Sequence, residues 1–123
     1  MNFTWTTLQV SDMEVSLHFY QEIIGLPLKR RFSPDGVMNL AFLGNEGESE
    51  IELICEPSNK KVTTQGISIG FMSKQTIEET IKILENHGYQ VVSPIISPNP
   101  NLRFIHVNNP DGYIVQLIQD MRK

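Results

Sequence analysis

Glu52 and Gln116 are polar side chains within two apolar segments that share one pattern of apolar and polar residues. Ile51-Glu52-Leu53-Ile54 matches Val115-Gln116-Leu117-Ile118 at a separation of 64 residues. Glu52 is flanked by isoleucine and leucine, so its carboxylate is expected to be partly desolvated, and such a group can act as a general base or anchor a cationic ligand. Gln116 offers only neutral hydrogen-bonding groups. These two positions therefore carry the clearest potential for chemistry.

A tight turn stands immediately before the second of these segments. The run Asn109–Gly112 reads Asn-Pro-Asp-Gly, in which proline has a fixed φ and glycine supplies a positive φ. In the strand that follows, alternation places Gln116 between Ile114 and Ile118 on one face. Gln116 is therefore either an exposed glutamine on a solvated face or a polar group that lines a cavity.

The first half of the chain has a counterpart in the second half. Residues 5–10 can be laid over residues 66–71, which lie 61 residues further on, and each segment is followed by a helix-like stretch that ends at Gly25 or Gly88. A short repeat period would indicate a solenoid. Two long copies instead indicate a duplicated module inside one domain.

Composition supports one domain of ordinary character. The chain has 123 residues, of which 40% are apolar and 20% charged. It has no apolar run near the length of a membrane helix, and its N-terminus lacks the charged-then-apolar pattern of a signal peptide. We therefore expect a cytoplasmic protein. The net charge of −4 argues against binding to a nucleic-acid backbone and agrees weakly with a cationic small ligand. The single cysteine, Cys55, is expected to be a structural thiol.

The first module is predicted to have the order βαβββ. Alternation predicts a strand over residues 4–10, and Ser11 with Glu14 forms a capping-box pattern for a helix over residues 12–24. The apolar stripe of that helix consists of Val15, Phe19, Tyr20, Ile23 and Ile24. Three further strands are predicted at Leu26–Phe32, Met38–Leu43 and Glu50–Cys55.

The second module is predicted to repeat this order after a linker over residues 58–64. A strand at Gly66–Met72 precedes a helix capped by Thr76 and Glu79, whose apolar stripe holds Ile77, Ile81 and Leu84. The remaining strands are predicted at Tyr89–Val92, Leu102–Val107 and Tyr113–Ile118, with a proline-rich loop at Ser93–Asn101. The modules thus span residues 1–57 and 65–123 of a single domain, 1–123.

Two local motifs and the doubled βαβββ order carry a resemblance to a known family. Residues 19–26, FYQEIIGL, resemble the family motif FYxxxLGL, and residues 109–117, NPDGYIVQL, resemble DPDGNxIEL. The chain is therefore similar to the vicinal oxygen chelate superfamily, which includes glyoxalase I, bleomycin resistance proteins and extradiol dioxygenases. The resemblance implies an α+β fold in which two βαβββ modules form a cupped eight-stranded mixed sheet around a cavity, with helices outside. Homodimers are common in such proteins.

Metal-dependent members of this superfamily hold a divalent ion with four residues, one on the first and one on the last strand of each module. The matching positions here are Trp5, Glu52, Gly66 and Gln116. Only Glu52 is a strong ligand, because indole has no usable lone pair, glycine has no side chain and an amide oxygen binds hard cations poorly. The resemblance thus predicts a protein without the family metal. A rearranged site of Glu52, His106 and Gln116 is the alternative, although His106 is more readily interpreted as a hydrogen-bonded pocket wall.

The predicted ligand-binding residues are those expected to face the cavity: Trp5, Thr7, Gln9, Glu52, Ile54, Ser68, His106, Ile114 and Gln116. Trp5 either stacks on a flat or cationic ligand or fills the space of the missing metal. Two functions remain open. One is a binding protein that holds a small organic molecule, which the missing metal ligands favour. The other is a lyase or isomerase of the glyoxalase type, with Glu52 as general base or sole surviving metal ligand and His106 as general acid.

Overall fold

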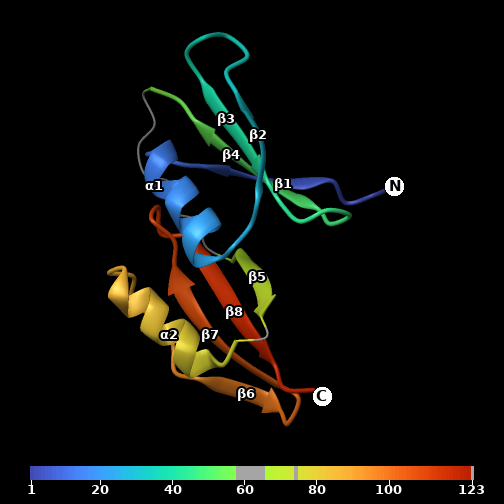
Figure 1. The fold of residues 1–123 in the computed structure, drawn as a ribbon, viewed down its shortest axis with the longest axis vertical. Helices are drawn as coiled ribbons and strands as arrows, with labels where there is room; N and C mark the ends of the chain where they lie inside the picture. The colour runs from blue at the N-terminus through green and yellow to red at the C-terminus, as the bar shows by residue number, and fades with distance from the viewer. Residues whose placement is uncertain (58–65, 74, 123) are drawn as a thin grey trace. The chain divides into compact units, whose positions relative to one another are not determined.

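A computed structural model describes residues 1–57, 66–73 and 75–122 (Figure 1). The predicted linker, 58–64, lies outside the described residues. The chain divides into two compact units, Met1–Val62 and Thr63–Lys123. Each unit has the order βαβββ and one four-stranded mixed sheet, so the predicted α+β fold of two such modules is confirmed. The joining of both sheets into one cup stays a prediction.

The first unit contains one helical segment and four strands. Its elements are β1 (Trp5–Gln9), α1 (Met13–His18), the π-helical turn η1 (Phe19–Ile23), β2 (Leu28–Phe32), β3 (Asn39–Leu43) and β4 (Glu50–Cys55). The strand order is β1-β4-β3-β2, with β1 parallel to β4 and the other pairs antiparallel. The helix α1 packs against β4 and covers one face of the sheet (Figure 1). The opposite face is called the open face of the first sheet.

Two details of the first helix differ from the prediction. Its N-cap is Asp12, whose carboxylate accepts a hydrogen bond from the Val15 amide, and not Ser11. Phe19 and Tyr20 of the predicted stripe are buried, but Val15 is 44% exposed. Met13, Ser16 and Leu17 are buried as well and, with Tyr20, follow the helical spacing i, i+3, i+4, i+7. Because Ser16 is polar, a search for apolar side chains alone identified the buried face only in part.

The second unit repeats the architecture. Its elements are β5 (Ser68–Ser73), α2 (Ile77–Asn86), β6 (Ile96–Asn99), β7 (Leu102–Asn108) and β8 (Ile114–Asp120). The strand order is β5-β8-β7-β6, and α2 packs against β7 and β8 (Figure 1). The predicted cap is confirmed, since the Thr76 hydroxyl accepts a hydrogen bond from the Glu79 amide. Within the described ranges, neither α1 nor α2 is long and apolar enough to span a membrane.

The strand predicted at Tyr89–Val92 is wrong, and β6 lies inside the predicted proline-rich loop. Only Val91 in that segment forms a bridge, to Val107. β6 is an edge strand, where a residue can lack a ladder partner on one side, so Pro98 is tolerated within it. The predicted loop treated proline as a strand breaker, which does not hold for a strand at the edge of a sheet.

Candidate functional site

The strand register of the first unit gathers its predicted site residues on the open face. Trp5 lies opposite Glu50, Thr7 opposite Glu52, and Gln9 opposite Ile54. The intervening residues, including Leu8 and Leu53, are buried on the face that α1 covers. Five predicted residues thus share one surface: Trp5, Thr7, Gln9, Glu52 and Ile54.

Glu52 makes one short hydrogen bond on this surface. The Thr7 hydroxyl donates to Glu52 Oε1 over 2.6 Å, across the β1–β4 pair. The bond is direct because the parallel register sets these two side chains next to each other on the same face. The carboxylate is half-buried, and a carboxylate can accept further hydrogen bonds beyond the one from Thr7.

Two cations of β2, Lys29 and Arg30, are directed to Glu50 and not to Glu52. Arg30 donates two hydrogen bonds to the Glu50 carboxylate, at 3.0 and 3.1 Å, and Lys29 Nζ lies 3.6 Å from the same group. The hydrogen bonds from Arg30 are the main cause that lowers the pKa of Glu50 below its ordinary value. Bidentate geometry of this kind fixes the guanidinium plane as well as its charge.

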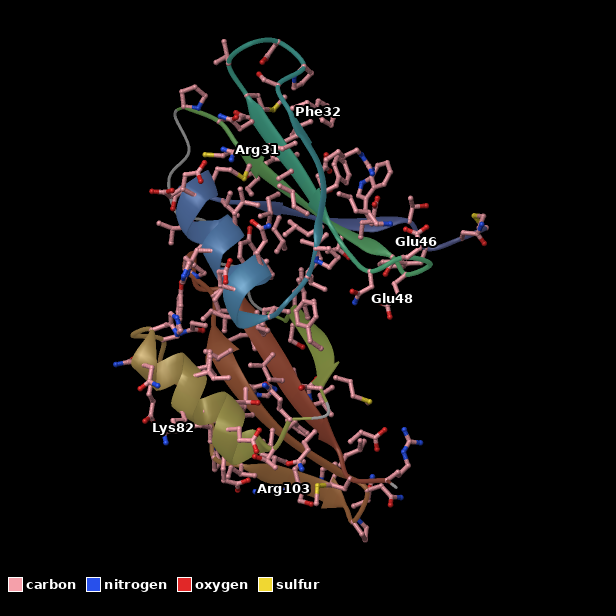
Figure 2. All side chains as sticks on the ribbon, viewed as in Figure 1. Arg31, Phe32, Glu46, Glu48, Lys82 and Arg103 are labelled. Carbon is pink, nitrogen blue, oxygen red and sulfur yellow. The ribbon has the colours of Figure 1, made fainter. Side chains whose placement is uncertain are left out.

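A cluster of three aromatic rings lies beside Glu52, and two of them, Phe42 and Phe32, were not predicted as site residues. The Trp5 and Phe42 rings meet edge to face with centroids 5.4 Å apart, while Phe32 stacks parallel to Phe42 at 6.3 Å. Arg30 lies over the Phe42 ring, with Cζ 4.0 Å from its centroid. Phe32 is at the end of β2 (Figure 2). The signal that would have found Phe42 is antiparallel register, because it lies directly opposite Glu52.

The second unit gathers a second set of predicted residues on one face of its sheet. Ser68 lies opposite Ile114, and His106 lies opposite Gln116. Ser68, His106 and Ile114 line one open hollow of about 370 Å³, together with Gly66, Ile67 and Val92. Ser93 Oγ accepts a hydrogen bond from the His106 amide at 2.9 Å, and the His106 ring lies 5.6 Å from that of Phe104. His106 is therefore a positioned wall of this hollow.

Gln116 lies directly opposite Gly70. This pairing shows that the predicted overlay of the two modules is wrong by two residues. Thr7 lies opposite Glu52, and Gly70 lies opposite Gln116, although the sequence overlay matched Thr7 with Ser68. A Cβ at Gly70 would meet Gln116 Oε1 at 3.5 Å, so the amide extends over the glycine. Gln116 is half-buried on the same face as His106, which fits the cavity-lining interpretation better than a fully solvated glutamine.

The chemistry of these residues does not fit the divalent metal of the family. In the first unit, Trp5 supplies no donor, and Glu52 is bonded to Thr7. In the second unit, Gly66, the predicted position, has no side chain. Ser68, which the observed register sets at the place of Trp5, has only a hydroxyl, and Gln116 supplies a neutral oxygen. Within the described residues, no three His, Cys, Asp or Glu side chains form a metal-binding group. Catalytic zinc ordinarily needs three protein ligands, so one carboxylate and one amide fall short.

The comparisons with known proteins agree on one family. A model of the Glyoxalase/Bleomycin resistance protein/Dioxygenase superfamily matches residues 2–117. The chain is 32% identical to a probable lactoylglutathione lyase of Synechocystis, over 96% of this chain and 95% of that protein. It is likewise 32% identical to the uncharacterized protein YwbC of Bacillus subtilis, over 93% and 94% of the two chains.

Solved structures show the same fold at lower identity. The glyoxalase I of Leishmania major aligns with a TM-score of 0.82 and 22% identity, covering 97% of this chain and 86% of that one. A glyoxalase family protein of Bacillus cereus aligns with a TM-score of 0.83 and 18% identity, covering 97% and 93%. At these identities the likeness concerns the fold alone.

Proposed function

Because the chain belongs to the glyoxalase/bleomycin resistance protein/dioxygenase superfamily, we propose that it binds a small organic molecule without the family's divalent metal. The observation that carries this proposal is the open face of the first sheet. There, positions that the resemblance assigns to metal binding hold Trp5, packed on Phe42, and Glu52, bonded to Thr7. An aromatic wall with a few polar groups is typical of organic-ligand sites.

The predicted residues of the second unit are proposed as a second set of ligand contacts. Ser68 and His106 offer hydrogen-bonding groups and Ile114 an apolar surface in the hollow of this sheet, and Gln116 lies directly opposite His106 on the neighbouring strand. We therefore propose ligand contacts within each module, 1–57 and 65–123. Glu52 and His106 are the two titratable groups assigned to the site.

Metal loading tests the proposal. After incubation with Ni²⁺ or Zn²⁺ and desalting, the protein is expected to retain far less than one metal ion per chain, because a single carboxylate is a weak site. Elemental analysis measures the content, and the melting temperature is expected to be the same with and without EDTA. One ion per chain, lost in both Glu52→Gln and His106→Ala, would instead support the rearranged site of Glu52, His106 and Gln116.

The second candidate is a lyase or isomerase that resembles lactoylglutathione lyase. The similarity to the probable lactoylglutathione lyase of Synechocystis and to the lactoylglutathione lyase of Haemophilus influenzae favours it, both at 32% identity. Glu52 would remove a proton beside a carbonyl, and His106 would return one. Turnover of a methylglyoxal–thiol adduct that disappears in Glu52→Gln would support this candidate over binding alone.

We also propose that the protein works as a homodimer in the cytoplasm and binds neither nucleic acid nor membrane. Support for a protein partner comes from four apolar side chains of the second unit that are 42–55% exposed, namely Ile67, Met72, Val92 and Ile95. The net charge of −4 opposes binding to a phosphate backbone.

A further inference from the structure

We propose that the ligand of the first sheet is an organic cation, a protonated or quaternary amine that places its charge against Glu52 and its apolar body against Trp5. This inference rests on the proposed function and adds the chemical class of the ligand. Three observations carry it: a carboxylate without a counter-ion among the described residues, an accessible tryptophan on the same face, and neighbouring cations that are already paired.

Glu52 has no cationic partner among the residues that the structure describes. Its carboxylate accepts a hydrogen bond from Thr7, which occupies one of about four acceptor positions. The side chain is half-buried on the open face, between Thr7 of β1 and Phe42 of β3, which lie directly opposite it on either side. A carboxylate that has lost part of its hydration gains most from an opposite charge placed against it.

The nearby cations are already paired with other carboxylates. Lys29 and Arg30 both pair with Glu50, and Arg31 pairs with Glu14 at 2.6 Å. Arg30 and Glu52 flank Phe42 on neighbouring strands, which sets their backbones roughly 10 Å apart from the usual strand spacing. Glu46 and Glu50 together balance the charges of Lys29 and Arg30, which reduces the repulsion between Arg30 and a cation at Glu52. An anionic ligand would have to displace these pairs.

Trp5 provides the surface that a substituted ammonium group prefers. It lies diagonally across the β1–β4 pair from Glu52, at a backbone distance of roughly 8 Å. Its side chain is 47% exposed, and its packing against Phe42 at 5.4 Å holds the indole in place. Aromatic faces attract cations, with tryptophan the strongest, and the gain rises when the cation is desolvated. A carboxylate and an indole at this spacing can contact one small ammonium group together.

Trp5 is the only tryptophan of the chain, so its fluorescence reports on this site directly. The probes are choline and its neutral isostere 3,3-dimethylbutan-1-ol, titrated into the metal-free protein. We expect choline to bind about tenfold more tightly than the alcohol, because only choline gains the ion pair and the cation–π contact. Glu52→Gln is expected to remove that preference. Glu22→Gln, an equal charge change at an exposed residue of the same unit, is expected to retain it.

Two results would overturn the cationic class. One is equal affinity for choline and the alcohol, or a choline preference that survives in Glu52→Gln. The other is an unchanged Trp5 fluorescence with choline up to about 10 mM. That concentration is high enough to detect binding with a free energy of only about −3 kcal/mol. Neither result would remove the proposed function, because a neutral organic ligand and a metal-free site would still be tested by metal loading and by a broader set of compounds.

Discussion

Replacing Phe42 with alanine is expected to lower the free energy of unfolding by about 3–5 kcal/mol, the usual cost of removing a buried aromatic ring. Phe42 is 5% exposed, and it contacts Trp5, Phe32 and Arg30. Its loss leaves a void between the two rings and removes the support of the indole. We therefore also expect the emission of Trp5 to shift to longer wavelength. Urea unfolding followed by that emission measures both effects.

Phe42→Leu is the matched control for this prediction. Leucine retains much of the volume, so the stability loss is expected to be about 1.5 kcal/mol or less, while the aromatic contact with Trp5 is still removed. A stable Phe42→Leu protein with shifted emission would separate the support of Trp5 from general unfolding. An alanine variant whose free energy of unfolding lies within about 1 kcal/mol of that of the parent protein would contradict the packing described for the open face.

The second large effect is expected at Asn109. Its Oδ1 accepts hydrogen bonds from the Asp111 and Tyr113 amides, at 3.0 and 2.9 Å, and the residue is 4% exposed. In Asn109→Ala both amides lose this acceptor inside the protein, and we expect a loss of about 2–4 kcal/mol in unfolding free energy. Far-UV circular dichroism during urea unfolding measures it.

Asn109→Asp distinguishes lost hydrogen bonds from any other disturbance of the turn. A carboxylate oxygen accepts the same two bonds, and aspartate is the residue at this place in the motif DPDGNxIEL that the turn resembles. Asn109→Asp is therefore expected to keep most of the parent stability. If it is as unstable as Asn109→Ala, the two amide bonds do not explain the role of this residue.

Elements with a strong local pattern could be predicted from the sequence. The turn at Asn109–Gly112 and the alternation of the last strand located β8, and Thr76 with Glu79 located the start of α2. Errors arose where a tertiary context overrode the local signal. Ser16 occupies a core position of α1 although it is polar, so the predicted apolar stripe did not include it. The edge strand β6 contains Pro98, which was predicted to lie in a loop.

The candidate site could be predicted only in part, for a physical reason. Alternation within a strand determines which residues share a face, and this placed Trp5, Thr7 and Gln9 together on β1 correctly, while the family resemblance added Glu52 from β4. Contacts between strands depend on register, which the sequence alone did not give. The Phe42 ring opposite Glu52 and the pairing of Arg30 with Glu50 were therefore missed, and the second module was overlaid two residues out of register.

Binding of an organic ligand is proposed to require no metal, and the fluorescence of Trp5 can show whether it does. The emission of Trp5 is followed while a library of small organic molecules is titrated into EDTA-treated protein, and each hit is repeated with one equivalent of Ni²⁺ or Zn²⁺. We expect at least one compound to bind saturably, with the same affinity with and without metal, and about tenfold more weakly to Glu52→Gln. Binding that occurs only after metal is added, together with turnover of a methylglyoxal–thiol adduct, would contradict the claim.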